Sequence, residues 1–349
     1  MAVKKYMSAL SSDGATLAKL IATFSVVLTH AHKIFGYIGV TDAQVFYLRG
    51  FHAFSSSGVP VFFLLSGYFL TVKDNFDYRI NLKKKFKSLV IPYCGFMLIY
   101  TCISCVGSQV LPAFFDDFTK FTARDWLMHL FGIPFVVGPE FYGPFWFIRE
   151  LFIFNLLSFA LVPAVKKIPG YLLIPAMIVL YFLPISRQIC YSIPLFLTGM
   201  YFGTKKNIPI LNHPIHLIVL FAAAFTVPIV FAGGLPRKVS IFLMALSTLM
   251  ISGKLAERDN LRRMARRAIP YSFPIYAMHE YPMVTIMRLL ALKHISLPAA
   301  VIAFFTVPFF VIAVCVCVAV IWKRLFPRTY MLFTGGRYEL NQRRIEAYA

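Results

Sequence analysis

The stretch ATLAKLIATFSVVLTHAHKIFGY, residues 15–37, decides the class of fold. It is mainly apolar and longer than the roughly 20 residues that an α-helix needs to cross a bilayer. Comparable runs follow along nearly the whole chain, near 52–72, 88–108, 144–163, 170–186, 189–204, 213–232, 238–254, 271–292 and 296–322. The sequence therefore predicts an all-α polytopic membrane protein, a bundle of about ten transmembrane helices.

The composition supports a single membrane-embedded domain. A soluble protein carries about 25% charged residues, whereas this chain carries 14%, and 59% of its residues are hydrophobic. No stretch is polar and long enough to form a separate soluble domain. We expect one membrane domain over residues 1–323, followed by a short basic cytoplasmic tail over 324–349.

The basic residues indicate a topology rather than a nucleic-acid partner. The formal net charge is +21 at pH 7, but most Lys and Arg residues lie in alternate short connections between the apolar runs. The positive-inside rule places such connections in the cytoplasm. We therefore expect a lipid bilayer and no nucleic acid as partner, with both termini cytoplasmic and 109–143 outside.

The cysteines do not indicate a metal site or a disulfide framework. All six lie within apolar runs, where buried cysteines act as small hydrophobic residues. Cys102 and Cys105 form a CxxC pair, but no second pair or histidine cluster completes a zinc ligand set. No metal site is predicted.

The first apolar run carries Lys19 and His30. They are eleven residues apart, which is about three helical turns, so both lie on one helix face about 16 Å apart. Ionisable groups at membrane depth are costly and often functional. Two other interpretations stay open: Lys19 extends to the headgroups, and His30 makes only an interhelical hydrogen bond.

Two further runs carry ionisable residues. Near the end, His279 and Glu280 are adjacent at about the depth of His30, and a carboxylate beside a histidine fixes its tautomer. The alternative is a pair that serves packing alone. The fourth run opens with Trp146, Arg149 and Glu150. Anchoring at the interface explains Trp146 and Arg149, but it explains Glu150 less well.

Two basic clusters precede apolar runs, Lys83–Lys87 and Arg262–Arg267. The positive-inside rule and contact with anionic lipid both explain their presence. It also fits a phosphate cradle for a cytoplasmic, nucleotide-bearing donor such as coenzyme A.

These residues, taken in order, resemble the motifs of the acyltransferase-3 family of integral membrane O-acyltransferases. The first motif of that family is an Arg, ten residues and a His, and here Lys19 precedes His30 at that spacing. The other similar segments are Phe62-Phe63-Leu64-Leu65-Ser66-Gly67, Lys83–Lys87 followed by Ile91-Pro92-Tyr93, Phe145-Trp146-Phe147-Ile148-Arg149-Glu150-Leu151, and Ser272-Phe273-Pro274-Ile275-Tyr276-Ala277-Met278-His279.

The resemblance implies how a donor is held. The donor would be acetyl-CoA, a co-substrate rather than a bound cofactor, presented from the cytoplasm. Lys19, Ser66, Lys84, Lys85 and Lys87 would bind it. Lys19 stands where the family has Arg, and Lys84-x-x-Lys87 is the nearest equivalent of its Arg-x-x-Arg element. Because Lys is a point charge and Arg binds phosphate with two donors, these departures are consistent with altered donor handling or with lost activity.

The resemblance also implies the chemistry and the acceptor. His30 would be the general base, oriented by Glu280, Glu150 or His279. The acceptor would be a hydroxyl of a cell-surface or lipid-linked glycan.

Arg149 and Trp146 would face that acceptor, and the protein would lie in the bacterial inner membrane. A transporter or flippase of lipid-linked sugars is the alternative, because it also places charges at mid-membrane depth.

Overall fold

The computed structural model describes residues 7–8, 11–73, 75–110, 121–126, 143–183, 188–206, 208–209 and 214–336. These residues are almost entirely helical. The strand pairing that the described residues contain is one short antiparallel ladder between β1 (Met7–Ser8) and β2 (Ile208–Pro209). The all-α class predicted from the sequence is therefore confirmed for the body of the protein.

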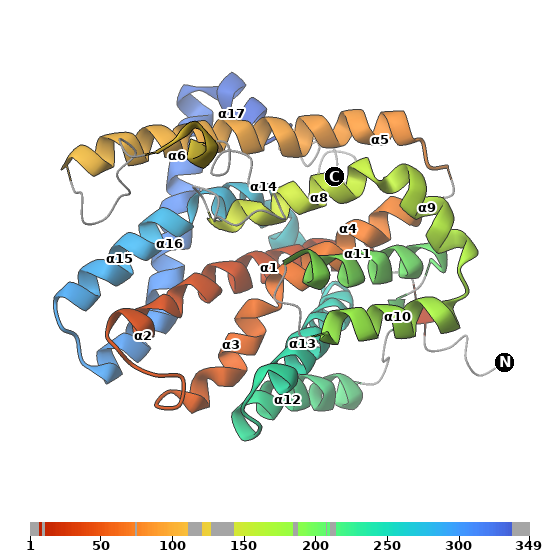
Figure 1. The fold of residues 1–349 in the computed structure, drawn as a ribbon, viewed down its shortest axis with the longest axis horizontal. Coiled ribbons are helices and arrows are strands. Elements are labelled where there is room, and N and C mark those ends of the chain that lie inside the picture. Colours follow the sequence, from red (N-terminus) through yellow and green to blue (C-terminus); the bar gives the residue numbers. More distant parts are fainter. Residues whose placement is uncertain are drawn as a thin grey trace.

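Figure 1 shows how the helices are arranged. In chain order they are α1 (Ser12–Ala31), α2 (Lys33–Tyr37), α3 (Arg49–Ser56), α4 (Gly58–Thr71), α5 (Tyr78–Lys85), α6 (Ile91–Val110), α8 (Trp146–Leu156), α9 (Ser158–Lys167), α10 (Gly170–Phe182), α11 (Gln188–Thr204), α12 (Pro214–Val230), α13 (Gly234–Leu255), α14 (Asp259–Met278), α15 (Glu280–Leu292), α16 (Leu297–Leu325) and α17 (Pro327–Phe333). Shorter turns join some of them: η2 (Phe46–Leu48), the π-helical turn η3 (Phe86–Val90) and η5 (Gly143–Phe145).

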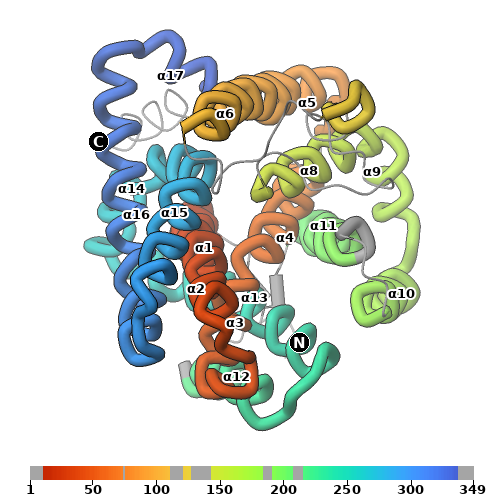
Figure 2. The backbone as a smooth tube through the Cα atoms, turned by 60° about the vertical axis from the view of Figure 1, so that its left-hand side comes forward, coloured from red at the N-terminus to blue at the C-terminus, as the bar shows by residue number. Residues whose placement is uncertain are grey.

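Helix α1 lies in the middle of the bundle, as Figures 1 and 2 show in red. It packs against α3, α4, α13, α14, α15 and α16. Ser11 caps its first turn by accepting a hydrogen bond from the Gly14 amide at 3.0 Å, which satisfies an otherwise unpaired donor. The buried face includes Ala15, Ala18 and Ala22. Small residues of this kind let neighbouring backbones approach closely, so α1 can contact many helices.

Among the residues that the structure describes, five helical stretches are long and apolar enough to cross a membrane: Ser12–Tyr37, Phe46–Thr71, Tyr78–Val110, Gly234–Leu255 and Leu297–Leu325. A sixth exists if Gly143–Leu156 and Ser158–Lys167 count as one span, although they meet at a bend of 70°. These stretches match six of the predicted runs. Length and composition thus support a multi-pass membrane protein.

The other four predicted runs form helices that are shorter or interrupted. Runs five to seven correspond to α10, α11 and α12, which have 13, 17 and 17 residues. The run 271–292 is divided at His279 between α14 and α15. Charged residues fill the first turns of α14, so it is not uniformly apolar. The count of ten spans and the cytoplasmic termini therefore stay predictions.

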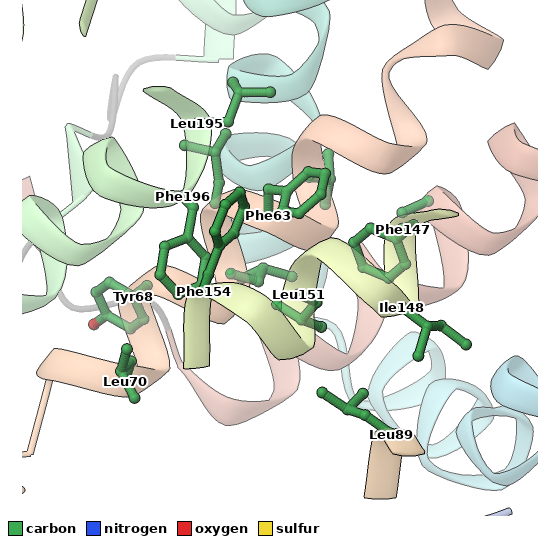
Figure 3. Packing of buried hydrophobic residues seen from close by; sticks show 14 of the residues in the cluster. Phe63, Tyr68, Leu70, Leu89, Phe147, Ile148, Leu151, Phe154, Leu195 and Phe196 are labelled. Carbon is green, nitrogen blue, oxygen red and sulfur yellow. The ribbon is translucent and has the colours of Figure 1, made fainter. Parts of the chain in front are cut away.

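Aromatic packing joins α4, α8 and α11 in the main core. The Phe63 ring lies 5.8 Å from Phe154, and Phe154 lies 5.1 Å from Phe196. Figure 3 shows these rings interleaved, with Leu151 and Phe147 continuing the cluster along α8. Aromatic pairs at these separations add to the free energy of burial.

Glycines let α4 and α11 pack with their backbones in contact. A Cβ added at Gly67 would fall on the Phe196 carbonyl oxygen, and one at Gly199 would fall on the Leu64 carbonyl oxygen. Thr71 also donates to the Met200 carbonyl oxygen at 2.6 Å. This crossing leaves no room for any side chain at the two glycines.

Helix α17 forms at the start of the predicted tail. Helix α17 folds back onto α6, where the Phe333 ring lies 5.9 Å from Phe96 and 5.4 Å from Trp322. Tyr330 is 1% exposed. Residues 337–349, the rest of the predicted tail, lie outside the described residues.

We predict that Gly67→Ala lowers the stability of the protein by about 1–3 kcal/mol, because the added methyl group must push α11 away from α4. Thermal unfolding of the purified protein in detergent measures the effect. Gly36→Ala is the matched control, since a Cβ there meets nothing within 4 Å. Equal unfolding temperatures for both variants would contradict the close crossing.

Candidate active site

His30 and Glu280 meet where the end of α1 faces the start of α15. The His30 Nδ1 atom lies 3.4 Å from Glu280 Oε1, and the two side chains are 16% and 15% exposed. His30 lies in the last turn of α1, and Glu280 is the first residue of α15. A carboxylate at this distance can orient an imidazole and stabilise its protonated form.

Lys33 shares the same carboxylate. Its Nζ atom lies 2.9 Å from Glu280 Oε1, and its side chain is 41% exposed. Lys33 follows His30 by three residues, so both side chains lie on one helix face. Lys33 was not among the site residues predicted from the sequence, although its spacing from His30 was a signal for it.

His279 lies behind this pair and is fully buried. Its Nδ1 atom is 2.8 Å from the Tyr276 carbonyl oxygen. Because a carbonyl oxygen only accepts, we assign the proton to Nδ1, which leaves Nε2 as an acceptor in the neutral ring. Nε2 has no hydrogen-bond partner among the described residues. The His279 and His30 ring centroids are 4.9 Å apart, with an interplanar angle of 69°. The two imidazoles are therefore in direct contact.

The turn before α8 closes over Glu280 and Tyr276. A Cβ added at Gly143 would lie 3.1 and 3.2 Å from the two Glu280 carboxylate oxygens. The Tyr276 hydroxyl donates to the Pro144 carbonyl oxygen, and its ring stacks on Phe145 at 6.1 Å and 13°. The absence of a side chain at residue 143 therefore leaves space for the carboxylate.

A cavity of about 360 Å³ brings together three predicted donor-binding residues, Lys19, Ser66 and Lys85. They come from α1, α4 and α5. Tyr276 of α14 also lines it, as does Phe147, whose place beside Ile148 on α8 is visible in Figure 3. The size is that of a small-molecule site. Tyr276 thus lines the cavity, and its carbonyl oxygen contacts His279.

The structure does not bring the other two predicted donor-binding lysines to this cavity. Lys84 and Lys87 are exposed, whereas Lys85 turns inward and Ser88 of the π-helical turn joins it. Adjacent helical residues point to different sides. Lys19 has an additional partner, since its Nζ atom lies 5.2 Å above the Phe69 ring.

The three predicted residues at the start of α8 make other contacts. Glu150 is 1% exposed and accepts a hydrogen bond from the Ser192 hydroxyl of α11. The Trp146 ring lies 6.1 Å from Phe63 in the main core. Arg149 is half-buried on the same helix. The structure thus links Glu150 to α11 and Trp146 to the core.

His32, Asp42 and His52 form a second cluster, with ligand atoms within 4.8 Å of one another. Arg237 Nη2 lies 2.9 Å from His52 Nε2, and Arg49 Nε lies 3.1 Å from Asp42 Oδ2. A metal ion would therefore face two guanidinium groups. The donor set does not fit a metal, and we read the cluster as a set of packing contacts between α1, α3 and α13.

The sequence matches the family described as "Acyltransferase domain", the acyltransferase-3 family, over residues 13–322. The chain belongs to this family. The predicted family is thus confirmed, and the protein is an O-acyltransferase. This identification favours an enzyme over the transporter or flippase that the sequence had left open.

A curated relative of the acyltransferase is "Succinoglycan biosynthesis protein ExoH" from Rhizobium meliloti (strain 1021). It is 26% identical over 305 residues, which cover 80% of this chain and 79% of the relative. No solved structure matches the chain.

We predict that Glu280→Gln slows acyl transfer by the acyltransferase about a hundredfold, because the amide keeps the volume but loses the charge that holds His30. Initial rates measured in detergent or proteoliposomes test this. Lys33→Met removes the other partner of the same carboxylate and should cost much less, since Lys33 lies toward solvent. A Glu280→Gln variant with the rate of wild type would show that the carboxylate serves only packing.

Proposed function

We propose that this acyltransferase moves an acetyl group from acetyl-CoA to a hydroxyl of a cell-surface or lipid-linked glycan in the bacterial inner membrane. The observation that carries the proposal is the cavity lined by Lys19, Ser66 and Lys85. It reaches Tyr276, whose carbonyl oxygen binds His279 beside His30. A donor in this cavity would bring its thioester toward the histidine pair.

The charges of the cavity suit the donor. Coenzyme A is anionic, and ammonium groups bind phosphates through charge-assisted hydrogen bonds. Lys19 and Lys85 supply such groups inside the cavity. Lys84 and Lys87 are exposed within one turn of Lys85, where they would meet the nucleotide phosphates while the pantetheine arm enters. Ten spans with both termini inside would put these lysines at the cytoplasmic surface.

The proposed reaction is direct transfer with general-base catalysis. His30 removes the proton from the acceptor hydroxyl while the hydroxyl oxygen attacks the carbonyl carbon of the thioester. The C–S bond then breaks, and the coenzyme A sulfur leaves and takes up the proton from His30. Glu280 keeps the imidazole oriented and stabilises its protonated form. Transfer through an acetyl-His30 intermediate is the variant of the same chemistry.

The acceptor is proposed from the relative and from the turn before α8. The name of that relative places it in succinoglycan biosynthesis, so a polysaccharide or its lipid-linked precursor is the acceptor class we infer for this chain. Gly143 closes over Glu280. Trp146 and Arg149 follow on the next two turns of α8, roughly 5 and 9 Å further along its axis, where we propose that they face the glycan.

Replacement of His30 by Ala should reduce acetyl transfer about 10²–10⁴-fold, the usual effect of losing a general base. The assay incubates purified protein with labelled acetyl-CoA and membrane glycans and counts label in the glycan. His32→Ala is the control on the same helix, because the His32 ring stacks on His52 at 4.2 Å and not on His279. Both variants must keep the unfolding temperature of wild type. Retained transfer in a folded His30→Ala protein would overturn the catalytic role.

Removal of the Lys19 ammonium should raise the KM for acetyl-CoA about tenfold or more, because a charged hydrogen bond to phosphate is lost. Lys19→Arg should keep or lower the KM, since Arg binds phosphate with two donors. Lys254→Ala is the control, as Lys254 is exposed and pairs with Glu257 at 2.8 Å. An unchanged KM in Lys19→Ala would leave Lys19 as a headgroup anchor.

A further inference from the structure

A groove of about 610 Å³ runs between α1, α14 and α16, separate from the donor cavity. Its walls are almost entirely apolar and include Phe24, Ile275, Ile312 and Val316. Arg263 and Arg267 line it near one end. No step of the proposed reaction uses this groove.

The groove is amphipathic along its length because of the register of α14. Arg263, Arg267, Tyr271 and Ile275 all line it, and their spacing of four residues places them in one stripe on the helix. The stripe changes from charged to apolar over twelve residues, which is about 18 Å. One leaflet of a bilayer has a hydrocarbon depth of about 15 Å. The stripe thus has the length and polarity of one leaflet.

The two arginines that line the groove differ from their neighbours in how their charge is matched. Arg266 binds Asp13 through two hydrogen bonds of 2.9 Å, and Arg262 binds Asp259. Arg263 donates a hydrogen bond to the neutral amide oxygen of Asn260. In the part of the chain that the structure describes, neither Arg263 nor Arg267 has a carboxylate partner. Their charge is therefore available to an anion.

The apolar end of the groove borders a face that is exposed to the bilayer. Helix α16 supplies Ile312 and Val316, and it is the most apolar of the five candidate spans, with only 28% of its apolar window buried. Phe309, Val318 and Ile321 are exposed on the same helix. A hydrocarbon chain can therefore enter from the side of the bundle.

We propose that this groove binds an anionic phospholipid from the leaflet at the Arg263 end. The lipid phosphate contacts the guanidinium groups of Arg263 and Arg267. One acyl chain lies along Tyr271 and Ile275 and packs against Ile312 and Val316. Guanidinium groups favour phosphate through paired hydrogen bonds, and burial of the acyl chain supplies the rest of the affinity.

The groove shares a wall with the donor cavity. Thr23 lines the groove, Ser272 lines the cavity, and their hydroxyls are 2.7 Å apart. Helix α14 presents Tyr271 and Ile275 to the groove and Ser272 and Tyr276 to the cavity. A bound lipid therefore packs against the helix that forms the inner end of the donor site.

The headgroup contact is tested by the unfolding temperature of the full-length protein in neutral detergent with added phosphatidylglycerol or phosphatidylcholine. Wild type should be stabilised saturably by phosphatidylglycerol and much less by phosphatidylcholine. Arg263→Ala/Arg267→Ala should lose this preference. Arg258→Ala/Arg262→Ala removes the same charge at the start of α14, outside the groove, and should keep this preference. Equal lipid preference in both double variants would overturn the site.

The chain contact is tested by filling the groove. Val316→Trp should abolish the stabilisation by phosphatidylglycerol, whereas Val318→Trp, on the exposed face of the same helix, should keep it. Native mass spectrometry should count one retained phosphatidylglycerol in wild type and in Val318→Trp, and none in Val316→Trp. Glycerol 3-phosphate serves as the headgroup without a chain. If it stabilises wild type as well as the lipid does, or if Val316→Trp retains the lipid, the groove is not a phospholipid site.

Discussion

The carboxylate of Glu280 imposes the strongest constraint on this bundle. A charge among packed helices is costly unless groups of opposite charge or proton donors surround it. Here His30 and Lys33 approach the same oxygen from the end of α1 and the start of α2. The turn at Gly143 leaves space for both oxygens. These contacts fix three distant segments of the chain relative to one another, and the histidine pair forms where they meet.

Helix α14 connects this centre to the rest of the protein. Its N-terminal half is tied to α1 by Arg266 and Asp13, and its middle is tied by Ser272 and Thr23. Its C-terminal end positions Tyr276, which donates to Pro144, and His279, which follows. One helix thus joins the arginine-lined groove, the donor cavity and the imidazoles. Residues that are neighbours in its sequence point to different sides of the helix, so Tyr271 and Ile275 line the groove while Ser272 and Tyr276 line the cavity.

The sequence predicted which residues belong to the site better than it predicted which residues they contact. The spacing of Lys19 and His30 is a property of one helix, and it could be read directly. The family motifs pointed to Ser66 and the basic run, and two of those residues, Ser66 and Lys85, line one cavity together with Lys19. Which lysine of the run faces inward depends on the phase of the helix through the π-helical turn, and the sequence does not reveal that phase. For the same reason the sequence did not predict the contact of Glu150, because its partner Ser192 belongs to a helix distant in sequence.

Hydropathy is also limited in what it says about the number of spans. Hydrophobic length identifies a helix such as α16 without reference to its surroundings. The run 271–292 also looked like one span, but it contains the polar pair at His279 and Glu280, and the chain changes helix there. Tertiary contacts of those polar groups decide such a break, so a window of hydropathy does not detect it.

Two prolines in α14 have a mechanical consequence. Pro270 and Pro274 lie on either side of Ser272, and each lacks the N–H that would continue the helical hydrogen bonds. The helix therefore resists bending least at the wall of the donor cavity. There the hydroxyl of Thr23 holds Ser272 from outside the helix. The contact between Thr23 and Ser272 therefore ties to α1 the part of α14 that has the fewest backbone hydrogen bonds of its own.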